Sequence, residues 1–131
     1  MKNTVTFLLA FTILALSAPA WAHVYLDHAD PRVGADLDKP PTEVRIWFTG
    51  EVDLPGSTLQ VLGPDGKQID KADIHAGPDA KDPQAKDRKL LVVSLPDKLP
   101  AGAYKVVWQA TSSADGHKTN GDFTFTVKPA K

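Results

Sequence analysis

Beyond residue 22, the sequence alternates between short apolar–polar runs and clusters of turn-forming residues. In residues 43–49, for example, Val44, Ile46 and Phe48 fall on one face of an extended chain. Residues 63–66 (GPDG) are a strong turn signal. No segment after the first 22 residues has the apolar period of a helix, so the pattern predicts an all-β domain.

The turn signals divide the chain into about seven expected strands. That number is typical of an immunoglobulin-like β-sandwich, in which two sheets bury their inner faces against each other. We expect the strands at residues 23–29, 43–49, 57–62, 67–74, 89–95, 103–112 and 122–128, with an irregular polar loop at 75–88.

Residues 1–22 have the pattern of a secretory signal peptide. Lys2 supplies the positive start, residues 6–16 (TFLLAFTILAL) the apolar run, and Ala20-Trp21-Ala22 the cleavage site. We expect cleavage after Ala22, which leaves residues 23–131 as one domain. An alternative cut after Ala20 would leave Trp21 as the first residue.

The composition of residues 23–131 excludes some classes of partner and of metal ligand. The leader holds one basic and no acidic residue, so the formal net charge changes from −1 to −2 when it is removed. This charge argues against nucleic acid or an anionic membrane as a partner, since either needs a basic patch. The chain has no cysteine, and its one methionine is Met1. The mature chain therefore offers no sulfur ligand to a metal.

Cleavage after Ala22 would make His23 the first residue, with a free α-amine and an imidazole that can hold one metal ion. Far along the chain, Asp115 and His117 lie two residues apart and point the same way on extended backbone. The set of three nitrogens and one oxygen suits Cu(II), which prefers tetragonal nitrogen and oxygen ligands. Zinc would accept the histidines and the aspartate, whereas Cu(I) prefers sulfur.

The plainer interpretation is that residues 113–121 form only a polar hairpin loop with an exposed histidine and Asn120-Gly121 as its turn signal. The other two histidines, His28 and His75, are expected to be solvated surface residues. The aromatic residues of the alternating strands are expected in the core rather than in a ligand platform; they are Trp47, Tyr104 and Trp108.

With these features in place, the chain resembles the CopC family of periplasmic copper-resistance and copper-carrier proteins, over nearly all of residues 23–131. The resemblance is carried by His23, Asp30-Pro31, residues 44–49 (VRIWFT) and, most specifically, residues 101–127 (AGAYKVVWQATSSADGHKTNGDFTFTV). It implies a seven-stranded Greek-key β-sandwich that binds copper outside the cytoplasm. It also implies that Cu(II) is bound by His23 through amine and imidazole, by Asp115 and by His117.

Some members of the family also have a Cu(I) site in a Met-rich loop with a histidine. The comparable loop here, residues 70–88, retains His75 but has no methionine, so the chain resembles a Cu(II)-only member. Members often have an acidic residue near the copper, just after the strand corresponding to residues 44–49. Glu51 is the candidate for that position here.

We therefore expect a periplasmic, monomeric carrier or buffer of one Cu(II) ion, not an enzyme, and the resemblance implies a CopD-like inner-membrane partner. An alternative is a histidine-brace copper oxygenase, but the chain is short, and Asp115 would occupy an equatorial position that oxygen chemistry needs. A further alternative is a metal-free immunoglobulin-like interaction module, which would not bind copper.

Overall fold

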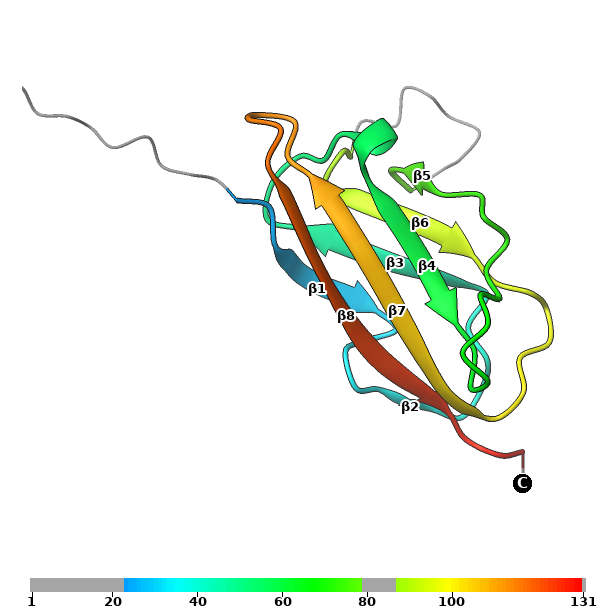
Figure 1. Ribbon diagram of the computed structural model, residues 1–131. Helices are drawn as coiled ribbons and strands as arrows, with labels where there is room; N and C mark the ends of the chain where they lie inside the picture. Colours follow the sequence, from blue (N-terminus) through cyan, green and yellow to red (C-terminus); the bar gives the residue numbers. More distant parts are fainter. Residues whose placement is uncertain (1–22, 79–86, 131) are drawn as a thin grey trace, which may run out of the picture.

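The computed structural model describes residues 23–78 and 87–130 (Figure 1). The expected signal peptide, residues 1–22, and the middle of the expected polar loop, residues 79–86, lie outside the described residues. The elements in chain order are β1 Leu26–Asp30, β2 Asp36–Leu37, β3 Glu43–Phe48, the 3-10 helix η1 Leu54–Gly56, β4 Thr58–Leu62, β5 His75–Ala76, β6 Leu90–Ser94, β7 Gly102–Thr111 and β8 Lys118–Val127.

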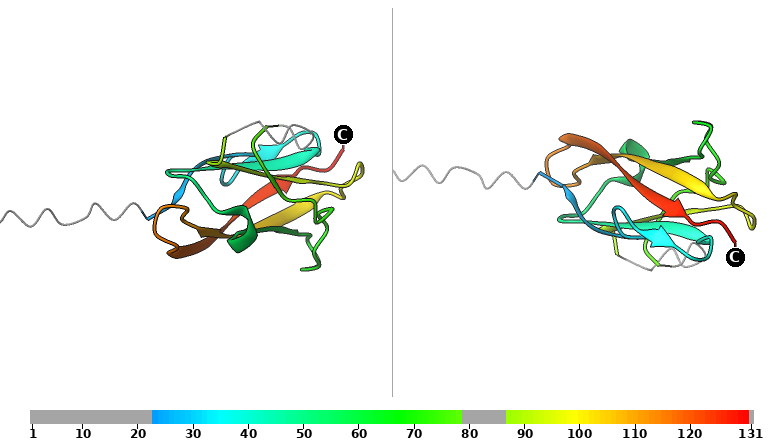
Figure 2. Two further views of the ribbon diagram at one scale, coloured as in Figure 1. Left: turned by 90° about the horizontal axis from the view of Figure 1, so that it is seen from above. Right: turned by 90° about the horizontal axis from the view of Figure 1, so that it is seen from below.

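The strands form two four-stranded sheets that pack face to face (Figure 2). One sheet has the order β1-β3-β6-β5 and the other β2-β8-β7-β4. All pairs are antiparallel except β2 with β8. The expected β-sandwich is confirmed. The described residues form eight strands rather than about seven, because the edge strands β2 and β5 are added and the expected strand at residues 67–74 does not form. With two residues each, β2 and β5 are too short to give an alternating pattern.

The core lies between the sheets and is built from the alternating residues that the sequence indicates. Phe48 of β3 packs edge-on against Trp108 of β7, with ring centroids 5.3 Å apart. Tyr104 of β7 stacks on Phe125 of β8, also at 5.3 Å. Such aromatic pairs bury large apolar areas, so they join the two longest strands firmly to the core. No helix in the described part of the chain has the length and apolar character needed to cross a bilayer.

Residues 67–74 run beside β4 but do not form the expected strand. Asp70 explains the difference, because its carboxylate accepts hydrogen bonds from the backbone N–H groups of Val61, at 2.8 Å, and Ala72, at 3.0 Å. The backbone of this segment contributes a bond from Ile69 N–H to the Val61 carbonyl, at 2.9 Å. A side chain thus replaces part of the strand ladder, as short polar side chains can do.

The expected turn at Asn120-Gly121 is wrong, because both residues lie inside β8. Gly121 is paired with Trp108, and a Cβ at Gly121 would lie 2.7 Å from Cζ2 of that ring. Glycine is needed here for the close approach of an aromatic ring rather than for a turn. The chain instead reverses before Lys118, which moves the β7–β8 turn to the residues that include Asp115 and His117.

Candidate metal centre

The β7–β8 turn presents Asp115, Gly116 and His117 at one end of the sandwich (Figure 1). The N–H of Ser112 donates to the His117 carbonyl at 2.9 Å and so extends the ladder past the ends of the strands. Gly116 has a φ of +73°, a conformation that glycine adopts without the strain a Cβ would add. The turn therefore holds His117 close to a rigid pair of strands.

Asp115 and His117 form a hydrogen-bonded pair within this turn. Oδ2 of Asp115 lies 2.8 Å from Nδ1 of His117, and Oδ1 accepts the His117 backbone N–H at 3.0 Å. These hydrogen bonds lower the pKa of Asp115 to about 2, and the bond with the His117 ring contributes most. The Asp115 carboxylate is therefore ionised at neutral pH. If Nδ1–H of His117 donates to this carboxylate, Nε2 is the ring nitrogen that would bind a metal.

His23 lies beside this pair although it comes from the beginning of the described chain. In Figure 1 the start of the blue segment lies near the turn between β7 and β8. Its ring centroid is 5.4 Å from that of His117, and the ring planes are inclined by 60°. The next residue, Val24, is only 2% exposed and belongs to the core. Thr49 at the end of β3 donates its backbone N–H to the Tyr25 carbonyl at 2.8 Å. The segment that carries His23 is thus fixed to the sandwich before β1 begins.

The sequence-predicted ligands His23, Asp115 and His117 are neighbours, but their donor atoms do not form a ready coordination sphere. Within residues 23–78 and 87–130, no three His, Cys, Asp or Glu side chains converge as ligands of one ion. The side chain of His117 is 49% exposed and that of Asp115 is 27% exposed. Both side chains have solvent into which they can turn, and side chains of this set would have to rotate for all three residues to bind one metal.

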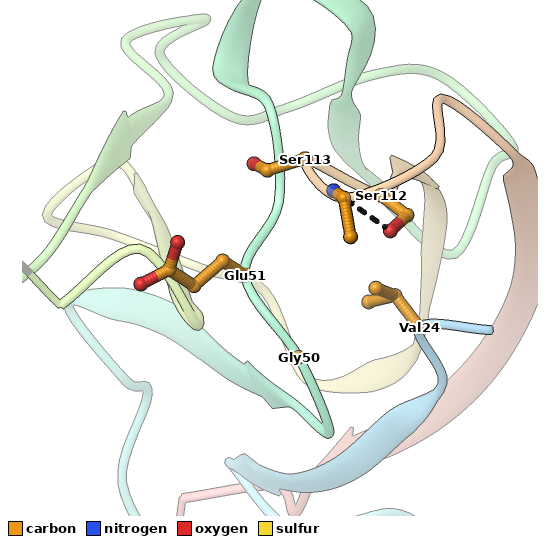
Figure 3. Close-up of a pocket in the computed structure, with 6 residues that line it drawn as sticks. Val24, Gly50, Glu51, Ser112 and Ser113 are labelled. Carbon is orange, nitrogen blue, oxygen red and sulfur yellow. Dashed lines mark hydrogen bonds between the residues drawn. The ribbon is translucent and has the colours of Figure 1, made fainter. Parts of the chain in front are cut away.

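Glu51 lines a hollow of about 280 Å³ next to this end of the chain, together with Val24, Gly50 and residues 112–114 (Figure 3). Its backbone carbonyl accepts the N–H of Ser113 at 3.0 Å. Its carboxylate points away from Val24, the neighbour of His23 (Figure 3). This arrangement does not bring the acidic group of Glu51 to the two histidines.

His28 is exposed, as expected, but it is not isolated. Its ring stacks on Trp47 at 4.4 Å with the planes 9° apart, and its Nδ1 lies 2.7 Å from Oδ2 of Asp27. The prediction that Trp47 belongs to the core is therefore wrong. Trp47 alternates with Ile46 and Phe48, which face inward, and so it lies on the outer face of β3.

The prediction that His75 is a solvated residue is also wrong, because it lies half-buried in β5 and pairs with Val92 of β6. Its Nδ1 is buried and has no hydrogen-bond partner among the residues that the structure describes. The sequence does not predict β5 because this strand has only two residues and lies at the start of a polar segment.

Three residues around His23 were not indicated by sequence motifs. The exposed Tyr25 has its ring centroid 6.1 Å from that of His23. The side chains of Thr49 and Thr119 bond to the carbonyls of His23 and Val24. The one sequence signal for these contacts is the position of Thr119, two residues beyond His117 and so on the same side of an extended chain.

Comparison with known proteins places these features in a family. The family model described as the CopC domain matches residues 26–128, which include Asp115 and His117 and begin three residues after His23. Protein YobA of Escherichia coli K12 is similar, with 33% identity over 96% of each chain.

Two solved structures are also similar. The crystal structure of CopC from Methylosinus trichosporium OB3b has a TM-score of 0.67 and 28% identity, and the match covers 83% of this chain and 97% of that one. PcoC, a methionine-rich copper resistance protein from Escherichia coli, has a TM-score of 0.63 and 27% identity, with coverage of 82% and 100%. The extent of the family match, together with these similarities, shows that the chain belongs to the CopC family.

Proposed function

We propose that this protein binds Cu(II) in the periplasm and acts as a copper carrier or buffer in copper resistance or homeostasis. The observation that carries the proposal is the 5.4 Å approach of the His23 and His117 rings, with Asp115 hydrogen-bonded to His117. Membership of the CopC family supports a role with copper, since the similar protein PcoC is a copper resistance protein.

In this proposal one Cu(II) ion is the cargo of each chain. His23 binds it through its imidazole and through the α-amine that cleavage after Ala22 would create, and Asp115 and His117 complete the set. Three nitrogens and one carboxylate oxygen match the tetragonal preference of Cu(II), and the charge of the carboxylate reduces the net positive charge of the complex. To bind the amine near neutral pH, the metal must displace a proton from it. Cu(II) displaces this proton better than zinc does.

The absence of sulfur from residues 23–131 favours Cu(II) over Cu(I), since Cu(I) prefers thiolate and thioether ligands. In contrast to the methionine-rich PcoC, this chain has its one methionine at position 1. We propose that the protein holds Cu(II) only and that His75, half-buried in β5, takes no part in copper binding.

A binding role accounts for Asp115 better than an oxygenase role does. A carboxylate beside His117 would take an equatorial place on the copper, and oxygen activation needs such a place to be open. We propose that the protein works as a monomer and passes its copper to a CopD-like protein of the inner membrane.

The test is a titration of the exported protein with each copper oxidation state against competing chelators, after mass analysis of its N-terminus. The proposal expects His23 as the first residue, one tightly bound Cu(II) and weak binding of Cu(I). A Cu(I) affinity equal to the Cu(II) affinity, or a first residue other than His23, would contradict it. A Cu(II) complex that releases peroxide with ascorbate and oxidises polysaccharide would favour the oxygenase instead.

A further inference from the structure

The residues just before β1 are held by side chains from both sheets of the sandwich. The hydroxyl of Thr119, near the start of β8, donates a hydrogen bond to the carbonyl of Val24. Val24 leads into β1, which belongs to the sheet opposite that of β8. This bond therefore joins the two sheets at the end of the molecule where His23 meets His117.

Thr49 holds the same segment from the other side. Its Oγ1 accepts the N–H of Tyr25 at 3.0 Å and donates to the carbonyl of His23 at 3.4 Å, while its backbone N–H donates to the Tyr25 carbonyl at 2.8 Å. One residue thus bonds to the backbone on both sides of Val24. The carbonyls of His23, Val24 and Tyr25 are all engaged, which leaves this short segment little freedom to rotate.

The position of Thr119 links this restraint to the other histidine. Thr119 lies two residues after His117, and the pairing of Lys118 with Thr111 and of Thr119 with Ala110 keeps this part of the chain extended. Side chains two residues apart on an extended chain point the same way. The β7–β8 turn presents His117, and the start of β8, two residues later, supplies the hydroxyl that holds the segment carrying His23.

We propose that Thr119 and Thr49 are positioning residues of the copper site, which hold the backbone of His23 beside His117 before the metal arrives. This inference rests on the proposed function and adds two residues to it, neither of which touches the metal. If either hydroxyl is removed, the first residues fray, and copper must then order them again on binding. The free energy of that ordering is subtracted from the binding free energy, so affinity falls while the ligand set stays the same.

The test uses the exported protein with Thr119→Val and Thr49→Val, each of which removes a hydroxyl but keeps the branched shape. Thr119→Ser restores the hydroxyl and serves as the rescue variant. Thr126→Val is the matched control, because Thr126 is also a half-buried threonine of β8 but lies at its far end, opposite β2. The measurements are the Cu(II) Kd, the electron paramagnetic resonance spectrum of the copper complex, and the Tm of the copper-free protein.

We expect the Kd to rise by about five- to tenfold in Thr119→Val and in Thr49→Val, as for the loss of one hydrogen bond. The spectrum of both valine variants should be unchanged, because their copper ligands are unchanged. Thr119→Ser and Thr126→Val should bind Cu(II) as tightly as the wild type does. A lower Tm with an unchanged Kd would overturn the inference, since the threonines would then only stabilise the fold. An equal loss of affinity in Thr126→Val would overturn it too. A wild-type protein that binds no Cu(II) would instead overturn the proposed function itself.

Discussion

The ring of His23 lies 5.4 Å from the ring of His117 between centroids, although one stands at the beginning of the described chain and the other near its end. A sandwich whose first and last strands lie in opposite sheets brings these two segments together. The contact exists only in the folded protein, so any metal that both rings bind is linked to folding.

Loss of either imidazole should weaken Cu(II) binding. We expect His117→Ala and His23→Ala each to raise the Kd at least about tenfold, or about 1.4 kcal/mol, since each removes one nitrogen of the proposed ligand set. His28→Ala is the matched control, because His28 is also exposed and also lies beside an aspartate, but stacks on Trp47. Competition titration gives the four values. A control that lost affinity as strongly as His117→Ala would show that the ligands are assigned wrongly.

Asp115→Asn keeps the shape of the side chain but removes its charge. The amide no longer offsets the positive charge of the copper complex, and it accepts the Nδ1–H of His117 more weakly than a carboxylate does. We expect weaker Cu(II) binding with the copper-free fold intact, measured by titration and by thermal unfolding. Glu51→Gln should leave the affinity unchanged, because the Glu51 carboxylate points away from Val24, the neighbour of His23 (Figure 3). The reverse order of effects would place Glu51 at the metal instead.

Acid should release the copper through its nitrogen ligands rather than through Asp115. Hydrogen bonds from His117 hold the pKa of Asp115 at about 2, below its usual range, so this carboxylate stays ionised until the pH approaches that value. Imidazole and amine nitrogens take up protons at higher pH and then cannot bind metal. From pH 7 down to about pH 4, the affinity should fall equally steeply in the wild type and in Asp115→Asn. A shallower fall in the variant, measured by competition titration across this range, would show that Asp115 takes up a proton there.

Gly121→Ala should destabilise the fold without altering the proposed copper ligands. The new Cβ would lie 2.7 Å from the ring of Trp108, and overpacking of this kind costs about 1–3 kcal/mol. Asn120→Ala, one residue earlier and exposed, is the control and should unfold as the wild type does. Denaturant unfolding gives both free energies. Equal stability of the two variants would mean that Trp108 can move away from β8 at little cost.

The sequence predicts those parts of the fold in which alternation is long and uninterrupted. Val44, Ile46 and Phe48 of β3, and the inward residues of β7, are buried as the pattern indicates. Prediction from the sequence fails where a single tertiary contact overrides the local structural preference of the residues. Gly121 stays in β8 because Trp108 covers it, and Asp70 takes the place of strand partners along residues 67–74. Neither contact leaves a periodic signal.

The candidate site also has parts that the sequence predicts and parts that it does not. Asp115 and His117 can be paired from their spacing alone, and the structure joins them by two hydrogen bonds. The approach of His23 to His117 depends on how the two sheets pack. Apart from the resemblance to the CopC family, the sequence indicated only that His23 has groups that can bind a metal. The contacts of Thr49 and Thr119 with the backbone have no motif, and the place of Thr119 two residues after His117 is their one sequence signal.

The central claim is that Cu(II) is held jointly by residues from both ends of the folded chain. Thermal unfolding of the exported protein, with and without one equivalent of Cu(II), tests it most directly. A ligand that binds only the folded state stabilises it by about 2.7 kcal/mol at a concentration one hundred times its Kd, so copper should raise the Tm strongly. If cleavage after Ala20 instead placed His23 third, copper bound by its amine, intervening amides and imidazole would survive unfolding. Tight Cu(II) binding with an unchanged Tm would therefore contradict the account.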